Sequence, residues 1–340
     1  IPTIVLYFWQ FPLANPLFLW TKVLFAIGLV AFGLPIFVLL ASLSIFFFLS
    51  EPSDWATNFD LISTISDSAY RIVVSPTLAA IPIFTLAGYI LAESKISKRL
   101  INFFKSSVGW IPGSTVLIVV LLCAFFTALT GGSGVTILAL GAILYPILIH
   151  DGYSKRFSLG IITTAGSLGL LFPPSLPAII YSVTAGINPL ELFRQAFIPA
   201  IFLMSIMFFY GLYKRPKVRK IEKFDLSKAL NSANIAKWEI AIPILIILSL
   251  FTGFATLVES AALLVLYVIS VELFIYKDIS MKDLPKIVIN CATLVGGVLI
   301  ILGFAMGFTG YLVDAQIPLK ILNYVQSTIS SKIIFLLALN

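Results

Sequence analysis

The sequence predicts an all-α, polytopic membrane protein with re-entrant helical hairpins, broken helices and inverted repeats. Of its 340 residues, 60% are hydrophobic and only 11% are charged, and the mean hydropathy is +1.07. A soluble domain of this size does not have such a composition. Apolar runs long enough to be membrane helices recur along the chain. Two of these runs are interrupted by polar, glycine- or proline-rich stretches, at Leu129–Val135 and Leu171–Ser175.

The basic residues indicate which loops face the cytoplasm. Most of the 22 lysines and arginines lie in four short segments, at residues 95–105, 155–156, 214–237 and 277–286. This is the positive-inside pattern of cytoplasmic loops. The net charge of +7 therefore points to a lipid bilayer and not to nucleic acid. Cys123 and Cys291 both lie in apolar runs, so we expect core residues and neither a disulfide nor a metal site.

The N-terminal part predicts two spanning helices. Residues 1–20 are apolar and aromatic, and they fit either the end of a preceding helix or an interfacial segment. Lys22–Leu49 predicts the first spanning helix, kinked at Gly33–Pro35. Glu51–Asp67 holds four acids and no base, which favours the outer side. Ser68–Ala92 predicts a second helix that returns to the basic side.

A short amphipathic helix is predicted next, over Ile96–Ser107. Its apolar residues make one face of the helix, and Lys98, Arg99 and Lys105 make the other face. We expect this helix to lie in the inner interface with those three basic residues toward water, although a soluble connector has a similar pattern.

The first interruption predicts a re-entrant hairpin over residues 113–150. Each apolar leg has about 15 residues, hence a length of roughly 23 Å, which is short of the roughly 30 Å hydrocarbon core. Lys105 precedes the hairpin and Lys155-Arg156 follows it, so both ends lie on the basic side. Two alternatives stay open: a tight pair of full-span helices, and glycines that only allow close helix packing.

The second interruption predicts a broken helix over residues 157–187. A proline pair at Pro173-Pro174 removes two N–H donors, so the helix opens there. Ser175 suits the start of the next half-helix, whose positive dipole end faces the gap. Phe193–Tyr213 then crosses back, which completes a first repeat over residues 21–213.

The rest of the chain predicts a second repeat over residues 238–340, after a basic cytoplasmic linker at 214–237. Trp238–Thr252 and Ala255–Tyr276 form an out-and-back pair, and Ile287–Val313 crosses outward. Ser331 begins another apolar leg. If that leg starts a second hairpin, it enters from the face opposite the first, as an inverted repeat requires.

Several charged residues in apolar surroundings have open roles. Glu259 fits an ion ligand, a proton site or a helix cap, because Thr256 and Glu259 have capping-box spacing. Glu272 lies near the cytoplasmic end of its helix, and Arg71 and Arg194 lie near outer helix ends. We expect these three to snorkel toward the interface, and an acidic partner is the alternative for Arg71 and Arg194.

A set of ordered motifs resembles the large membrane subunit of TRAP (tripartite ATP-independent periplasmic) transporters. The resemblance covers roughly residues 22–340, and two positions depart from the family's motifs: Gly132 replaces a hydroxyl residue at the hairpin tip, and Leu257 replaces a proline. The motifs are Gly109–Ser114, Leu129–Gly134, His150–Tyr153, Gly169–Ser175, Glu191–Phe193 and Gly253–Ala261.

The resemblance implies an elevator-type secondary transporter of the bacterial inner membrane. It would import a small organic acid, such as a carboxylate or sugar acid, driven by a sodium gradient. Its partners would be a small four-helix membrane subunit and a periplasmic substrate-binding protein. Residues 1–20 would suit the end of a fused small subunit, and the natural protein is expected to extend beyond both ends of this chain.

Sodium is a hard cation that suits carbonyl and hydroxyl oxygens, which opened helix ends supply. We expect Na⁺ as the coupling ion, with no other metal and no organic cofactor. A carboxylate substrate would face half-helix N-termini, and Thr256 and Glu259 are further substrate or ion candidates. The predicted ion-binding residues are Thr130, Gly131, Gly132, Ser133, Gly134, Pro173, Pro174 and Ser175.

Two rival functions remain at this point. A stand-alone sodium/dicarboxylate symporter would share the architecture and work without a binding protein. An intramembrane serine protease would use the Gly-x-Ser-Gly pattern around Ser133. That enzyme needs a base within hydrogen-bond reach, and the only histidine, His150, lies about 25 Å away if the intervening leg is helical. We therefore expect a transporter and not an enzyme.

Overall fold

The computed structural model describes residues 16–49, 62–63, 65–71, 74–216, 224–329 and 331–339. Within these ranges the regular structure is helical and contains no strand. Five of the described helices are long and apolar enough to cross a membrane, or up to seven spans if each bent pair counts as one. The predicted all-α polytopic class, with broken helices, is therefore confirmed.

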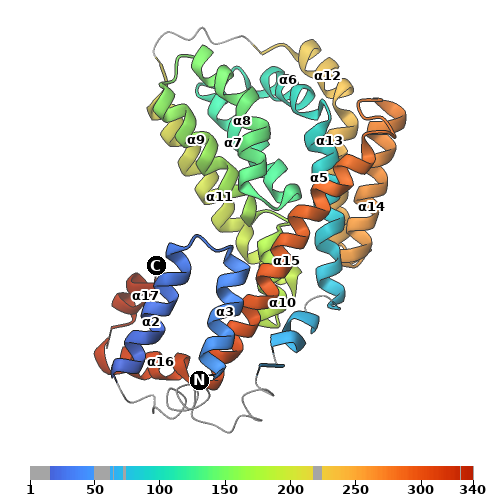
Figure 1. Cartoon of the computed structure of the whole chain (residues 1–340). Helices are drawn as coiled ribbons and strands as arrows, with labels where there is room; N and C mark the ends of the chain where they lie inside the picture. Colours follow the sequence, from blue (N-terminus) through green and yellow to red (C-terminus); the bar gives the residue numbers. More distant parts are fainter. Residues whose placement is uncertain are drawn as a thin grey trace. The chain divides into compact units, whose positions relative to one another are not determined.

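The chain folds as two compact units (Figure 1). The terminal unit comprises residues 1–75 and 296–340, and the central unit comprises residues 76–295. Helix α15 (Leu284–Asp314) contributes its first part to the central unit and the rest to the terminal unit. The predicted repeat boundary at 214–237 falls inside the central unit, and the inverted symmetry of the two repeats stays a prediction.

The terminal unit has a small aromatic core. Phe48, Ile65 and Tyr311 are buried together, and the rings of Phe48 and Tyr311 meet edge to face with centroids 5.4 Å apart. The sequence did not separate the first two of its helices. Its described helices include α2 (Pro16–Ala31), α3 (Ile36–Leu49), α16 (Ile317–Thr328) and α17 (Lys332–Leu339).

The first predicted spanning helix, Lys22–Leu49, is wrong as a single kinked helix. The chain leaves helical geometry between α2 and α3, where Gly33 has a φ of +66°. The rings of Phe25 and Phe46 stack at 4.3 Å, so the two helices lie side by side. Glycine adopts this left-handed φ without a Cβ penalty, which converts a predicted kink into a turn. Residues 1–15 and 50–61, which include most of the two predicted segments 1–20 and 51–67, lie outside the described residues.

The second predicted helix, Ser68–Ala92, is also interrupted. Residues 65–71 are helical where described, but the chain is not helical at Val74 and Ser75. A 3₁₀ turn, η1 (Pro76–Ala79), then leads into α5 (Ala80–Glu93). Pro76 lacks a backbone donor and restricts the residue before it, so a helix tends to end there.

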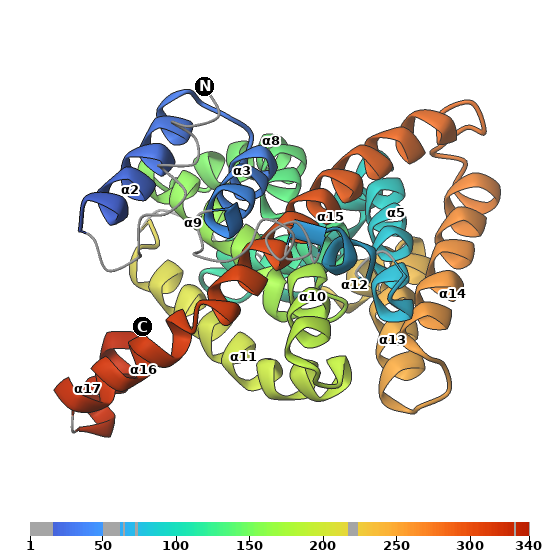
Figure 2. The ribbon, with the colours of Figure 1, turned by 60° about the horizontal axis from the view of Figure 1, so that its bottom comes forward.

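The central unit is built around α7 (Ser114–Thr130). All but a narrow stripe of its side chains are buried, and it packs against α5, α9 and α11 among others. Figure 2 shows α5, α13 and α14 grouped on one side of this unit. The remaining described elements are α6 (Ile96–Val108), α8 (Ser133–His150), α9 (Lys155–Leu168), η2 (Gly169–Leu171), α10 (Leu176–Ala185), α11 (Pro189–Tyr213), α12 (Leu226–Ile235), α13 (Lys237–Phe251), α14 (Leu257–Ser270) and the π-helical turn η3 (Val271–Ile275).

Part of the predicted basic linker is ordered as a helix. Residues 217–223 lie outside the described residues, but α12 begins directly after Asp225. The Asp225 carboxylate caps it by accepting from the backbone N–H of Ser227 at 3.0 Å, a favoured N-cap arrangement. Helix α12 packs against α6, and both lie at the end of the central unit where the hairpin helices begin and end (Figure 1).

Candidate functional site

Two helices, α7 and α8, form a hairpin over the predicted stretch and are separated by only Gly131 and Gly132. Because α8 is itself long and apolar enough to cross a membrane, the re-entrant topology of this hairpin stays a prediction. Gly131 ends α7 with a φ of +69°, and Gly132 is extended as the N-cap of α8. A left-handed residue is the common way to stop a helix, and glycine is the residue that adopts it most readily. At the other end, the Thr115 hydroxyl hydrogen-bonds to the Asp151 carboxylate and ties the two helices together.

The hairpin tip gathers hydroxyl and carbonyl oxygens. Thr130 is buried, and its Oγ1 lies 3.1 Å from Oγ1 of Thr136. Both hydroxyls also approach the carbonyl oxygen of Gly132, at 3.5 and 3.4 Å. Ser133 is half-buried at the first position of α8, and Gly134 is exposed. Thr136 was not among the predicted site residues, and it adds a second buried hydroxyl.

Thr127 is the most informative residue that the sequence reasoning missed. It is fully buried, and among the described residues its Oγ1 has no hydrogen-bond partner. Its carbonyl accepts from the N–H of Gly131 at 2.9 Å, so it lies one turn below the hairpin tip. A buried hydroxyl without a partner destabilises a fold by about 1–3 kcal/mol unless a water or an ion satisfies it. The three-residue spacing from Thr130 places both hydroxyls on one helix face and was the signal available in the sequence.

The predicted helix break lies directly against this hairpin. α9 with η2 and α10 form a pair bent by 41°, and the Pro173-Pro174 peptide between them is cis. Ser175 is buried and caps α10, with its Oγ accepting from the N–H of Ala178 at 3.5 Å. Pro174 is buried as well, and Pro173 is half-buried.

Close packing joins the break to the tip. A Cβ added to Gly131 would lie 2.7 Å from Cβ of Leu176, the first residue of α10. A Cβ added to Gly169 would lie 2.4 Å from Cβ of Thr127. Both glycines therefore allow an approach that a larger residue would prevent. The structure thus brings together the two stretches, 130–134 and 173–175, that the sequence singled out separately.

The Thr256–Glu259 pair forms the capping box that the sequence left as one of three alternatives. The Thr256 side chain accepts from the N–H of Glu259 at 3.3 Å, and the Glu259 carboxylate accepts from the N–H of Thr256 at 2.8 Å. Both residues are exposed. Helix α14 packs mainly against α5. The cap is confirmed, and a role of the pair as substrate or ion ligands stays a prediction.

A buried ion cluster corrects the predicted positions of Arg99 and Glu272. Arg99 does not face water: its guanidinium binds carboxylates of Glu239, Glu272 and Asp278. Its side chain is 14% exposed, and the side chains of Glu239 and Glu272 are fully buried. Glu272 therefore does not snorkel; it lies 3.4 Å from Arg99.

The cluster joins α6 to α13 and to the turn after α14. Arg99 also lies over the ring of Tyr276, 3.8 Å from its centroid, and the Tyr276 hydroxyl donates to Glu239 at 2.9 Å. Burial, reinforced by the hydrogen bond to Glu239, raises the pKa of Tyr276. Burial alone would raise the pKa of Asp278, but hydrogen bonds from Arg99 and from the Lys95 backbone outweigh it and lower that pKa.

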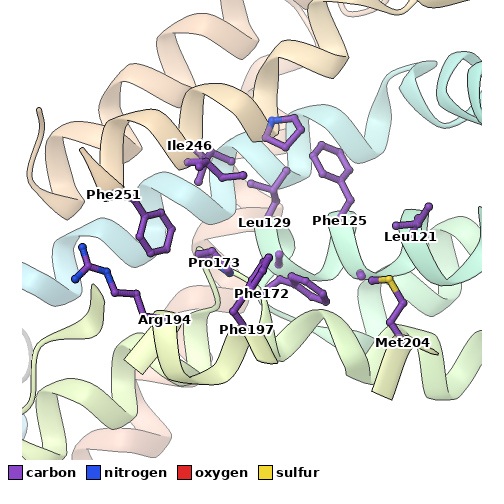
Figure 3. Close-up of a pocket in the computed structure, with 14 residues that line it drawn as sticks. Leu121, Phe125, Leu129, Phe172, Pro173, Arg194, Phe197, Met204, Ile246 and Phe251 are labelled. Atoms are coloured by element: carbon purple, nitrogen blue, oxygen red, sulfur yellow. The ribbon is translucent and has the colours of Figure 1, made fainter. Parts of the chain in front are cut away.

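An apolar cavity of about 450 Å³ flanks the helix break (Figure 3). Its walls come from α7, α11 and α13, with Phe172 and Pro173 of the break between them. Arg194 lies at one end, and Leu121 and Met204 lie at the other. The stripe of α7 that is not buried, which includes Leu121 and Phe125, faces this cavity.

The geometry of the described residues does not support the alternative of an intramembrane serine protease with Ser133 as its nucleophile. α8 is one continuous helix, so Ser133 and His150 stand at its opposite ends, about 25 Å apart. The His150 side chain is 91% exposed and lies 3.7 Å from the carboxylate of Asp151. The distance argues against a Ser–His pair.

A family model described as "Tripartite ATP-independent periplasmic transporter, DctM component" matches residues 23–340. The chain is 32% identical over 267 residues to the C4-dicarboxylate TRAP transporter large permease protein DctM of Pseudomonas aeruginosa, covering 78% of this chain and 62% of that protein. It is 28% identical over 307 residues to the ectoine TRAP transporter large permease protein TeaC of Halomonas elongata, covering 88% and 70%.

The isethionate TRAP transporter permease protein DctMQ of Oleidesulfovibrio alaskensis is 27% identical over 283 residues, covering 82% of this chain and 44% of that protein. The chain spans about three fifths of the length of the C4-dicarboxylate relatives that it matches. These relatives are transporter permeases.

Proposed function

Because the chain belongs to the DctM family, the large permease component of tripartite ATP-independent periplasmic transporters, we propose that it serves in the sodium-driven import of a small organic acid. The observation that carries the proposal is the meeting of the hairpin tip with the helix break, beside a buried hydroxyl that has no partner. Broken helices inside a bundle supply ion and substrate ligands in secondary transporters.

The sodium ion would bind among oxygens at the end of α7. The hydroxyls of Thr127 and Thr130 and the last carbonyls of α7 are hard, neutral donors, which suit Na⁺ without burying a net negative charge. The C-terminal end of a helix carries a partial negative charge that favours a cation. The orphan Oγ1 of Thr127 supports this assignment, because an ion would satisfy it.

The organic acid would face the opposite ends of the neighbouring half-helices. α8 starts at Ser133 and α10 starts at Leu176, and both starts lie at the tip and break. Helix N-termini present free N–H groups and a positive dipole end, which favour a carboxylate. Relatives are named for C4-dicarboxylate, isethionate and ectoine, so a small charged organic solute is the substrate class we assign.

The working complex would contain two further proteins. We assign a small four-helix membrane subunit, separate or fused, and a periplasmic substrate-binding protein that delivers the organic acid. The complex would lie in the bacterial inner membrane with its lysine- and arginine-rich loops in the cytoplasm.

A thermal-unfolding series on the full-length purified protein tests the ion site. Unfolding is followed in Na⁺, K⁺ and choline salts at matched ionic strength. A ligand at a hundredfold excess over its Kd stabilises the native state by about 2.7 kcal/mol. We expect a Na⁺-selective rise in Tm that is reduced in Thr127→Val, Ser133→Ala and Ser175→Ala.

The matched control is Thr163→Val on α9. Thr163 is exposed, and in the described part of the chain its hydroxyl hydrogen-bonds only within its own helix, to the carbonyl of Leu159 at 3.0 Å and that of Gly160 at 2.9 Å. It should keep the full sodium response. Equal Tm values in all three salts would refute sodium binding, and an unchanged response in the site variants would move the ion elsewhere.

A further inference from the structure

The cavity beside the helix break has a lining that does not suit a small polar substrate. Among the residues that surround it, Arg194 alone carries a charge, and the others are apolar. A dicarboxylate or similar solute placed there would bury polar groups without hydrogen-bond partners, which is unfavourable. The occupant that fits such a lining has a long apolar part and one anionic group.

The length of the cavity is close to the thickness of the hydrocarbon layer of one membrane leaflet. Along α11 it runs from Arg194 to Met204, ten residues or about 15 Å of helix. α11 is itself long and apolar enough to cross a membrane, and half of a hydrocarbon core is also about 15 Å. An acyl chain of one leaflet therefore matches the cavity in length, and Figure 3 shows the charged residue at one end of it.

Arg194 lies where a lipid phosphate would be. It is in the second turn of α11, which begins after the N-cap Asn188, so it is near one end of the span. Within the described residues no carboxylate forms an ion pair with it, and its guanidinium lies over the ring of Phe251, 5.9 Å from the centroid. Guanidinium groups bind phosphates through two parallel hydrogen bonds.

We propose that this cavity is a binding site for an anionic phospholipid of the surrounding membrane. One acyl chain occupies the space between α7, α11 and α13, and the phosphate pairs with Arg194. The lipid would fill the gap between the hairpin with its break and the α13 wall. The proposal is independent of the transport function, because lipid binding is measured without transport.

The test uses the full-length protein purified in detergent. Its Tm is titrated with phosphatidylglycerol and with phosphatidylcholine of the same acyl chains, and retained lipid is counted by native mass spectrometry. We expect phosphatidylglycerol to stabilise more. Loss of a charge-assisted hydrogen bond predicts a roughly tenfold weaker phosphatidylglycerol affinity in Arg194→Gln, whereas Arg194→Lys keeps part of it.

Two variants fill the cavity from opposite walls. Ala128→Phe on α7 and Ile247→Trp on α13 should abolish the response to both lipids, and Ile247 is 51% exposed, so its replacement leaves the core intact. Arg71→Gln, an exposed arginine of the terminal unit, is the charge control and should respond as the wild type does. The lipid-free Tm identifies any variant that fails to fold.

The outcomes separate clearly. Equal stabilisation by both lipids in the wild type, or a phosphatidylglycerol preference that persists in Arg194→Gln, would overturn the proposal. Stabilisation by small organic acids through Arg194, with no response to lipid, would overturn it as well and would assign the cavity to the substrate.

Discussion

Gly88 on α5 is the residue on which the position of the hairpin tip depends most directly. A Cβ at this position would lie 2.7 Å from the carbonyl carbon of Leu129 and from the backbone nitrogen of Thr130. Backbone atoms cannot rotate away as a side chain can, so Gly88→Ala must displace the tip. Overpacking of this kind costs about 1–3 kcal/mol. We expect a lower Tm and a weaker response to Na⁺ in the thermal series.

Gly160 supplies the matched comparison for that prediction. It is also a helical glycine, on α9, but no atom lies within 4 Å of a Cβ added there. Gly160→Ala should be neutral, or more stable by up to about 1 kcal/mol, because alanine favours a helix more than glycine does. A Gly88→Ala variant with wild-type sodium binding would show that the tip is not the ion site.

The residues that the sequence missed share a physical reason. Thr130–Gly134 and Pro173–Ser175 were found because they break an apolar pattern locally. Gly88 and Thr127 do not break it; each is one small residue in a helical run. Their importance comes from the helix surfaces that face them, which depend on packing between elements distant in the chain. Thr127 and Gly169 are in contact in space, and nothing in either local segment indicates it.

Among the elements, α6 is held in place by its buried ion cluster. Among the described residues, Arg99 binds Glu239, Glu272 and Asp278 together, while Lys95 pairs with Asp278 only. Removal of Arg99 leaves the buried carboxylates of Glu239 and Glu272 without a counter-charge, which destabilises by about 3–5 kcal/mol. We therefore expect Arg99→Ala to lower the Tm strongly, whereas Lys98→Ala, an exposed neighbour, should change stability by less than about 0.5 kcal/mol. Similar Tm values for both variants would show that the cluster does not hold α6.

Asp278, at the rim of this cluster, predicts an acid-sensitive contribution to stability. The pKa of Asp278 is lowered in the folded protein, so folding is favoured by its charged form. That stability is present above the ordinary aspartate pKa of about 3.9 and is lost as pH falls through the lowered value. We expect Asp278→Asn to be less stable than the wild type at neutral pH and to lose less stability below about pH 4. Asp283→Asn, an exposed acid nearby, removes the same charge and serves as the matched control.

At the element scale the sequence located helices well and their partners poorly. The amphipathic segment Ile96–Ser107 is nearly identical to α6, because its pattern is local. Its polar face was assigned to water, yet Arg99 binds Glu239, 140 residues further along the chain. For Lys22–Leu49 the sequence located the apolar stretch but not the turn inside it. A glycine followed by a proline is compatible with a kink and with a turn. The left-handed φ of Gly33 and the stacking of Phe25 on Phe46 show that it is a turn.

For the whole molecule, composition alone predicted the class, because burying so many apolar residues without a bilayer is not feasible for a chain of this size. The arrangement into repeats was a different kind of inference. The inverted repeat requires a second hairpin, whose first leg was predicted to begin at Ser331. The described part of that leg is α17, which has eight residues. The arrangement of the second repeat therefore stays a prediction. The function is therefore best tested on the complete assembly.

The decisive measurement at that scale is uptake of a panel of radiolabelled small organic acids into proteoliposomes that contain the full-length permease and its small subunit. We expect uptake only when an inward sodium gradient and the periplasmic binding protein are both present, because the ion supplies the driving force and the binding protein delivers the substrate. Ser133→Ala should reduce the sodium-dependent rate, and Thr163→Val should not. Sodium-driven uptake without the binding protein would instead identify a stand-alone symporter, since the hairpin and break would then receive substrate directly from solution.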